Sequence, residues 1–167
     1  MKIYTSYILI AIVISLFVSS CKQVKLEDAD KRFSEGKYYV AADMYRQIYR
    51  KTPAKQRELR GEIALKQAES YRLINNTVRA NAAYANAVRY NAPDSTLSLQ
   101  YARSLHKAGE YPPAIKQYDE FLKLFPKNRF ALNGIAGAKQ APEWPANPTL
   151  FKFRQMTLFS SHKCEDL

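Results

Sequence analysis

The chain has 167 residues and is basic, with 26 Lys and Arg against 15 Asp and Glu and a formal net charge of +11 at pH 7. This length is enough for one domain with a real hydrophobic core. The five glycines are scattered and form no phosphate-binding loop, and the two histidines lack the spacing of a metal site on one helix face. We therefore expect no metal and no cofactor.

The N-terminus combines a basic start with a short apolar run. Residues 7–18 are almost wholly apolar, which is too short for a membrane-spanning helix of roughly 20 residues but suits a secretory signal. The sequence VSSC at residues 18–21 fits a cleavage site and resembles the bacterial lipobox, whose cysteine thiol accepts the lipid. We expect a lipoprotein signal peptide at 1–20, lipidation of Cys21 and a short tether at 21–25. An ordinary cleaved signal, or a signal-anchor with an incidental cysteine, is the alternative.

Export changes the interpretation of the basic charge. A high net charge by itself suggests a nucleic-acid partner, but an exported chain meets none, so no nucleic-acid binding is predicted. Anionic lipid, cell-wall polymer or an acidic protein surface are better candidates, and charges spread over helices more often form a solvated surface. A lipidated Cys21 cannot pair with Cys164, the only other cysteine.

One residue pattern occurs three times at intervals of 39 and 34 residues. Gly36, Asn75 and Gly109 stand where a first helix must end, because glycine adopts the left-handed conformation freely and asparagine tolerates it. Small residues allow helices to approach closely, tyrosines fill the space beside them, and prolines end the second helix. These positions are Ala29, Ala68 and Ala102; Ala41, Ala80 and Ala114; Tyr45, Tyr84 and Tyr118; and Pro53, Pro93 and Pro126.

The spacing is that of the tetratricopeptide repeat, and the resemblance covers about residues 26–127. It implies an all-α solenoid of three helix pairs, because a single pair cannot bury its own apolar face. Residues 129–141 are predicted to form a final capping helix, which completes a domain at 26–141. Prolines make residues 142–167 a stiff linker followed by an irregular tail. Within that tail, TLFKFRQM partly alternates like a strand without a partner.

Catalysis receives little support from the sequence. Ser104 and Lys107 have the Ser-x-x-Lys spacing of penicillin-recognising enzymes, but so do Ser160 and Lys163, and the other motifs of that class do not accompany either pair. The chain is therefore predicted not to be an enzyme.

A groove is the stronger candidate site, because the first helix of each tetratricopeptide repeat lines a concave surface that takes peptides. The resemblance places Leu26, Asp30, Phe33, Leu65 and Glu69 on this face. Arg72, Arg103 and Lys107 could hold a carboxylate or acidic segment there, although ordinary solvated charge is an equally good interpretation. The predicted groove residues that contact a partner are Arg72, Leu73, Leu99, Arg103, His106 and Lys107.

A second basic cluster spans residues 45–60 and is interpreted as an exposed rim near the membrane. Its cations are Arg46, Arg50, Lys51, Lys55, Arg57 and Arg60.

The tail extends the resemblance. Residues 147–149 (NPT) and 159–161 (FSS) resemble the segment that leads from such repeats into a β-propeller in large Bacteroidota lipoproteins related to OmpA. One branch, the PorE type, belongs to the type IX secretion apparatus. The resemblance implies that 142–167 is the truncated start of a propeller, so peptidoglycan binding is not expected. No acidic run directly follows Cys21, which favours the inner face of the membrane.

The predicted function is accordingly a scaffold in the outer membrane, lipid-anchored and facing the periplasm, which binds protein partners of an envelope or type IX secretion-related assembly. Assistance in outer-membrane β-barrel assembly is the alternative, although lipoproteins with that role usually carry about five repeats.

Overall fold

The computed structural model describes residues 24–146, which form seven α-helices followed by a 3-10 helix. The predicted signal peptide, Cys21 and the tail from residue 147 lie outside the described residues. Among the helices that the structure describes, none is long and apolar enough to cross a membrane. The elements are α2 (Leu26–Ser34), α3 (Tyr38–Lys51), α4 (Arg57–Leu73), α5 (Thr77–Arg89), α6 (Leu97–Lys107), α7 (Tyr111–Leu124), α8 (Arg129–Gln140) and η2 (Ala141–Ala146).

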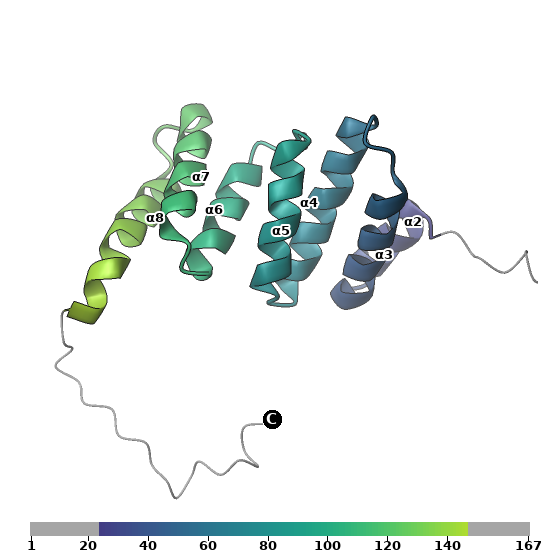
Figure 1. Ribbon diagram of the computed structural model, residues 1–167, viewed down its shortest axis with the longest axis horizontal. Coiled ribbons are helices and arrows are strands. Elements are labelled where there is room, and N and C mark those ends of the chain that lie inside the picture. Colours follow the sequence, from purple (N-terminus) through teal and green to yellow (C-terminus); the bar gives the residue numbers. More distant parts are fainter. Residues whose placement is uncertain (1–23, 147–167) are drawn as a thin grey trace, which may run out of the picture.

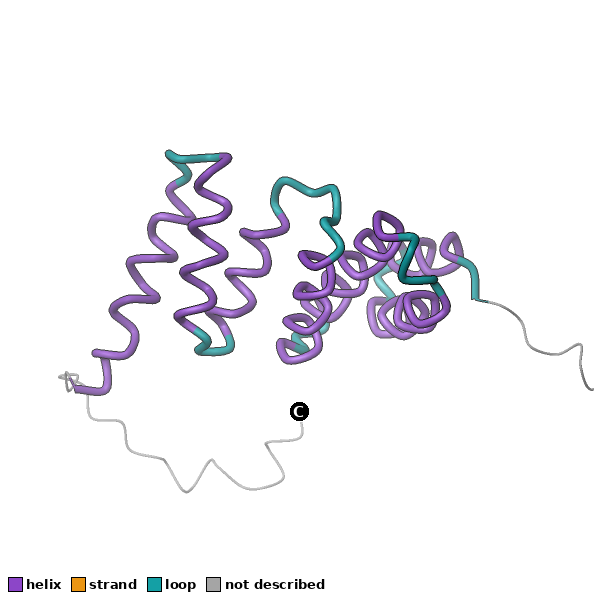
Figure 2. The backbone as a smooth tube through the Cα atoms, turned by 45° about the horizontal axis from the view of Figure 1, so that its top comes forward, coloured by secondary structure: helices purple, strands orange, loops and turns teal. Residues whose placement is uncertain are grey.

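The helices form one elongated row of antiparallel pairs, α2 with α3, α4 with α5, and α6 with α7, and α8 covers the far end (Figure 1). Each helix packs mainly on its neighbours in sequence, and α8 also touches α6. The two ends of the described chain therefore lie at opposite ends of the row, as the tube in Figure 2 also shows. The all-α solenoid of three helix pairs and a capping helix is confirmed.

The first helix of each pair ends as its sequence predicts. Gly36, Asn75 and Gly109 have φ angles of 74°, 61° and 78°, in the left-handed region. The residue after each of them donates its backbone N–H to a carbonyl five residues earlier, as in a Schellman motif. Asn91, with φ 54°, ends α5 in the same way, a turn that the repeat pattern did not indicate.

The repeated alanines form the contact surfaces between helices. All six of the predicted alanines have no exposed surface, and the three repeated tyrosines are at most 3% exposed. The core follows the row: Ile63 of α4 packs with the residues of the first pair, and Leu97 of α6 packs with those of the second. Each pair thus completes the core of the pair before it, which is why the stack is stable although no single pair encloses a core.

The five residues inserted between the first and second repeats lie in a loop and in the long N-terminal part of α4. This helix has 17 residues, against 11 in α6. The extension places Arg60 beside the end of α3, where its Nη1 donates to the carbonyls of Tyr49 (3.2 Å) and Thr52. Pro53 stands where the N–H for the Tyr49 carbonyl would be, so Arg60 replaces a helix hydrogen bond that proline cannot make.

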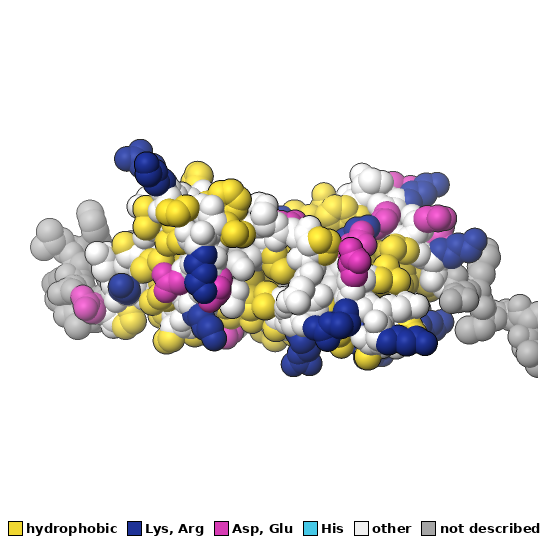
Figure 3. All heavy atoms as spheres, turned by 90° about the horizontal axis from the view of Figure 1, so that it is seen from above, with side chains coloured by type: hydrophobic (Ala, Val, Ile, Leu, Met, Phe, Trp, Pro, Cys, Tyr) yellow, Lys and Arg dark blue, Asp and Glu magenta, His cyan; other side chains and the backbone are white. Residues whose placement is uncertain are grey.

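The guanidinium of Arg60 also stacks on two rings, 4.1 Å from the centroid of Tyr49 and 5.0 Å from that of Tyr90. This member of the predicted basic rim is therefore partly buried and ties two repeats together. Lys and Arg side chains occur along the whole face seen in Figure 3, with hydrophobic side chains between them.

The capping helix α8 depends on a glycine. A Cβ at Gly134 would lie 2.4 Å from Cζ of the Tyr118 ring, so the tyrosine packs directly on the bare helix backbone. A Cβ at Gly137 would lie 3.5 Å from Cε1 of the His106 ring. Gly134 lowers the intrinsic helix propensity of α8, but its missing side chain is what allows α8 to pack on Tyr118.

The α-helix ends at Gln140, before the proline-rich segment. The prediction of a stiff linker from residue 142 needs correction for its first part, because residues 141–146 form the 3-10 helix η2. The fixed φ of proline is compatible with 3-10 geometry. The N–H groups of the first residues of such a turn have no acceptor within it, so a proline there loses no hydrogen bond.

Candidate functional site

A cleft of ≈ 230 Å³ opens between the C-terminal end of α4 and the exposed side of α6. Four of its residues lie on one face of α6, at spacings of three, one and three residues, as a helix requires. Three of the lining residues carry positive charge and none carries negative charge. The lining consists of Arg72, Thr77, Gln100, Arg103, Ser104 and Lys107.

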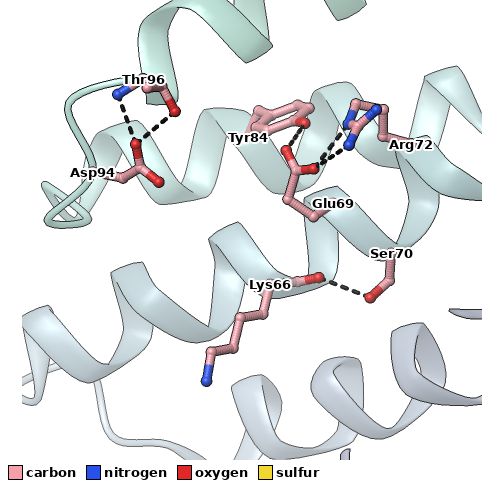
Figure 4. Close-up of polar contacts among 7 residues, drawn as sticks. All are labelled: Lys66, Glu69, Ser70, Arg72, Tyr84, Asp94 and Thr96. Atoms are coloured by element: carbon pink, nitrogen blue, oxygen red, sulfur yellow. Dashed lines mark hydrogen bonds and ion pairs between the residues drawn. The ribbon is translucent and has the colours of Figure 1, made fainter. Parts of the chain in front are cut away.

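Glu69 holds Arg72 at the edge of this cleft. Arg72 donates from Nε (2.8 Å) and Nη2 (2.6 Å) to one carboxylate oxygen of Glu69, and the other oxygen accepts from the Tyr84 hydroxyl (Figure 4). The carboxylate therefore joins a groove arginine to a buried tyrosine of α5. The hydrogen bonds that Arg72 donates to Glu69 raise the pKa of Arg72, and burial together with the same carboxylate raises the pKa of Tyr84 well above its usual value.

Arg103 has no hydrogen-bond or ion-pair partner among residues 24–146. Its position corresponds to Asp30 and Glu69 in the earlier repeats, at the same intervals of 39 and 34 residues. In those repeats the carboxylate accepts the repeated tyrosine hydroxyl, at 2.6 Å between Tyr45 and Asp30. The third repeat replaces the acid by arginine, which leaves a cation directed at the cleft instead of an internal acceptor.

Of two other charged positions along the repeats, one is balanced and one is not. Lys66 donates to both carboxylate oxygens of Asp30 at 2.9 Å, so the first acidic position is neutralised by a lysine of the next repeat. Lys107 donates to the side-chain oxygen of Asn75, a neutral acceptor, so its charge is not compensated. With Glu69 counted against Arg72, the cleft keeps the charges of Arg103 and Lys107.

The structure thus brings together three of the six predicted groove residues: Arg72, Arg103 and Lys107. The other three lie elsewhere. Leu73 is exposed beside the cleft without lining it, and Leu99 is half-buried against the core of the third pair. His106 packs edge-on against two tyrosine rings of α7, with Nδ1 3.4 Å from the Tyr118 hydroxyl.

His106 therefore occupies the junction of α6, α7 and α8, where its ring lies beside the Tyr118 hydroxyl, the group that a carboxylate binds in the first two repeats. The alignment of position 103 with the two acids was readable from the sequence and would have shown this exchange.

The residues that the structure describes contain no group of three His, Cys, Asp or Glu side chains able to hold a metal ion. Ser104, one of the serines with Ser-x-x-Lys spacing, is 6% exposed and lies in the cleft wall with Lys107.

Because Tyr45 and Tyr84 are buried and donate to carboxylates, we expect the free energy of unfolding to fall in alkali. Burial raises the pKa of Tyr45 and Tyr84 above the value of about 10 in an unfolded chain. Below that pH both states keep the proton, so the full stability is present. Above it the unfolded state releases protons first, and the free energy of unfolding falls by about 1.4 kcal/mol per pH unit and per tyrosine.

Urea unfolding between pH 9 and 11.5 measures this slope. Tyr84→Phe is expected to lower the slope, whereas Tyr39→Phe, at a side chain 70% exposed, should leave it unchanged. An equal slope in all three proteins would contradict the prediction.

The fold is that of a tetratricopeptide-repeat solenoid, and solved structures of such domains resemble it. The first TPR of Spaghetti (RPAP3), bound to the HSP90 peptide SRMEEVD, has a TM-score of 0.55 and 22% identity over 70% of this chain and 88% of that one. The second TPR domain of human RPAP3, in complex with the HSP70 peptide SGPTIEEVD, has a TM-score of 0.55 and 21% identity over 70% and 94%.

The first TPR domain of human RPAP3 is similar at a TM-score of 0.56, with 22% identity over 74% of this chain and 94% of that one. No protein-family model matches the chain, and no curated protein sequence matches it either. At these identities the similarity concerns the fold.

Proposed function

We propose that this chain is a scaffold that binds protein partners through the cleft between α4 and α6, and that it recognises an acidic segment of the partner. The observation that carries the proposal is the uncompensated charge of Arg103 and Lys107 in a cleft without a lining carboxylate. Arginine presents a planar fork of N–H donors that matches a carboxylate, so an acidic side chain or chain end fits this charge.

Preformed helices support this function physically. The cleft residues lie on α4, α6 and the start of α5, whose backbones are fixed by the core, so a ligand need not order the site on binding. Two of the similar solved structures hold peptides that end in acidic residues. A scaffold that uses helical repeats without catalysis is consistent with both features.

The sequence adds the cellular setting to the proposal. The lipobox-like VSSC at residues 18–21 supports a lipid anchor at Cys21 in the outer membrane, facing the periplasm, and the tail resemblance supports an envelope or type IX secretion-related assembly. Cys21→Ser is expected to abolish membrane attachment and processing. Affinity capture of the anchored protein should then recover secretion components, and recovery of the barrel-assembly machinery instead would contradict this assignment.

Binding of a model acidic peptide tests the cleft directly. We expect the full chain to bind a fluorescein-labelled hexapeptide of alternating Asp and Glu, and Arg103→Gln to weaken this binding by about tenfold, the value of one lost charge-assisted hydrogen bond. Fluorescence anisotropy measures the affinity. Lys116→Gln removes an equal charge from an exposed position on α7 and is the matched control.

Because Arg103 has no partner among the described residues, its replacement should not alter the fold. Equal weakening by Arg103→Gln and Lys116→Gln would show that the peptide senses net charge alone, and the proposed cleft would then be rejected.

A further inference from the structure

A second basic cleft lies on another side of the stack, and nothing in the proposed peptide site uses it. It has a volume of ≈ 300 Å³, within the range of about 300–1,000 Å³ typical of small-ligand pockets. Its floor is formed by α4 and its walls by α3 and α5. The lining residues are Arg46, Tyr49, Arg50, Gln67, Tyr71, Arg79, Ala82, Ala83 and Asn86.

The two clefts use different faces of α4. Gln67 and Tyr71, one turn apart, form the floor of the second cleft, whereas Arg72 belongs to the first. Successive residues of a helix are rotated by about 100°, so Tyr71 and Arg72 point to different sides. Occupancy of one cleft therefore does not obstruct the other.

Three guanidinium groups converge on this second cleft. Arg46 and Arg50 lie one turn apart on α3, and Arg79 lies in the first turn of α5 with its guanidinium carbon 5.8 Å from the centroid of the Tyr71 ring. The guanidinium groups of Arg50 and Arg79 have no hydrogen-bond or ion-pair partner within the described part of the chain, although the backbone N–H of Arg79 donates to the Asn76 side chain. No carboxylate lines the cleft.

Asp43, an acid on α3 beside the cleft, is already engaged. Asp43 accepts from Gln47 (2.8 Å) and from Nη2 of Arg46, and these bonds lower its pKa. Nε of Arg46 is buried and has no acceptor among residues 24–146. The pair with Asp43 therefore leaves this guanidinium incompletely satisfied, and Asp43 acts on Arg50 only through space, without an ion pair.

The repeat itself does not require these arginines. Arg46 follows the core tyrosine of the first repeat, and Arg79 lies four residues after the helix-ending Asn75. At the positions that correspond to Arg46 and Arg79, the other repeats carry no cation. Ala85 and Asp119 correspond to Arg46, and Val40 and Pro113 correspond to Arg79. Only Arg50 has basic residues at its corresponding positions. The cluster is thus particular to the space between α3 and α5.

We propose that this cleft binds a phosphate group, carried either by an anionic phospholipid or by a soluble phosphate ester. Arginine forks bind phosphate oxygens in pairs, and three of them around one space suit a group with several charged oxygens. The rings of Tyr49 and Tyr71 and the methyl groups of Ala82 and Ala83 give the substituent of the phosphate an apolar wall. The side-chain amide of Asn86 adds a neutral donor.

Two arms of one experiment separate the sources. Isothermal titration of the full Cys21→Ser chain with glycerol 3-phosphate measures soluble binding. Flotation with phosphatidylcholine vesicles, with or without 30% phosphatidylglycerol, roughly the anionic fraction that gives a clear surface potential, measures headgroup binding. Binding in either arm supports the site. Binding in the vesicle arm alone identifies a lipid headgroup, binding in the titration alone identifies a soluble ester, and binding in both shows that the cleft recognises the phosphate group on either carrier.

The variants decide whether the binding is local. Arg50→Gln/Arg79→Gln removes the two unpaired cations and should weaken binding by at least about tenfold. Arg89→Gln/Lys116→Gln removes the same charge from exposed positions outside the cleft and should change it less than about twofold. Adding Arg46→Gln should abolish binding, and circular dichroism checks that this variant, which loses the Asp43 pair, remains helical.

Absence of binding in both arms would overturn the proposal, as would equal loss in the cleft double variant and its control. Neither result would affect the peptide cleft, which shares no lining residue with this one.

Discussion

Replacing Arg60 with methionine is expected to lower the free energy of unfolding by about 3 kcal/mol. Two hydrogen bonds from a charged donor are lost, and the Tyr49 carbonyl is left without the partner that Pro53 cannot supply. The stacking of the guanidinium on Tyr49 and Tyr90 is lost as well, at about 0.5–2 kcal/mol. Methionine keeps most of the apolar stem of the arginine side chain, so the loss of stability measures the contribution of the guanidinium group.

Arg57 provides the control for this prediction. It donates to the Arg89 carbonyl at 2.9 Å and lies 5.4 Å from the centroid of the Tyr90 ring, but its side chain is exposed. Arg57→Met should therefore cost under about 1 kcal/mol. Urea unfolding followed by circular dichroism measures both variants. A loss for Arg60→Met no greater than that for Arg57→Met would show that the link between repeats contributes little.

Gly134→Ala should destabilise the protein by about 2 kcal/mol, although alanine normally stabilises a helix by about 1 kcal/mol relative to glycine. The added Cβ would lie 2.4 Å from the Tyr118 ring, far inside contact distance. That ring is 3% exposed and is held between the helices, so it cannot swing away without opening the junction of α7 and α8. Overpacking of this kind typically costs about 1–3 kcal/mol.

Gly137→Ala is the matched control, because it lies one turn further along the same helix. Its Cβ would meet the His106 ring at 3.5 Å, an ordinary van der Waals contact, so the propensity gain should prevail and the protein should become slightly more stable. Thermal unfolding of the two variants measures the difference in sign. If both variants were stabilised, α8 would not be docked on Tyr118 as described.

The two glycines show how far sequence reasoning reached. Propensity alone treats Gly134 and Gly137 as equal weaknesses of the capping helix. The distance to Tyr118 separates them, and that distance depends on how α8 is placed on α7. No local pattern encodes the placement, because it results from the fit of two helices whose residues lie 16 positions apart.

The candidate sites divide in the same way. The spacing placed Arg72, Arg103 and Lys107 on one face of the repeats, and the structure brings all three to one cleft. The same spacing put His106 beside them, but the tyrosines of α7 draw its ring into the helix junction. The basic segment 45–60 was interpreted as one exposed rim, whereas the structure buries Arg60 partly and turns Arg46 and Arg50 to a separate cleft.

The sequence by itself determined the repeat: where helices end, which small residues allow close approach, and how many pairs stack. These features follow from local constraints, since a left-handed residue or a proline acts on its own turn and a 34-residue period repeats the same contacts. The tertiary structure decided which charges are compensated and which face a cleft. Compensation depends on distances between side chains of different repeats, such as Lys66 to Asp30, and only the stacked helices fix those distances.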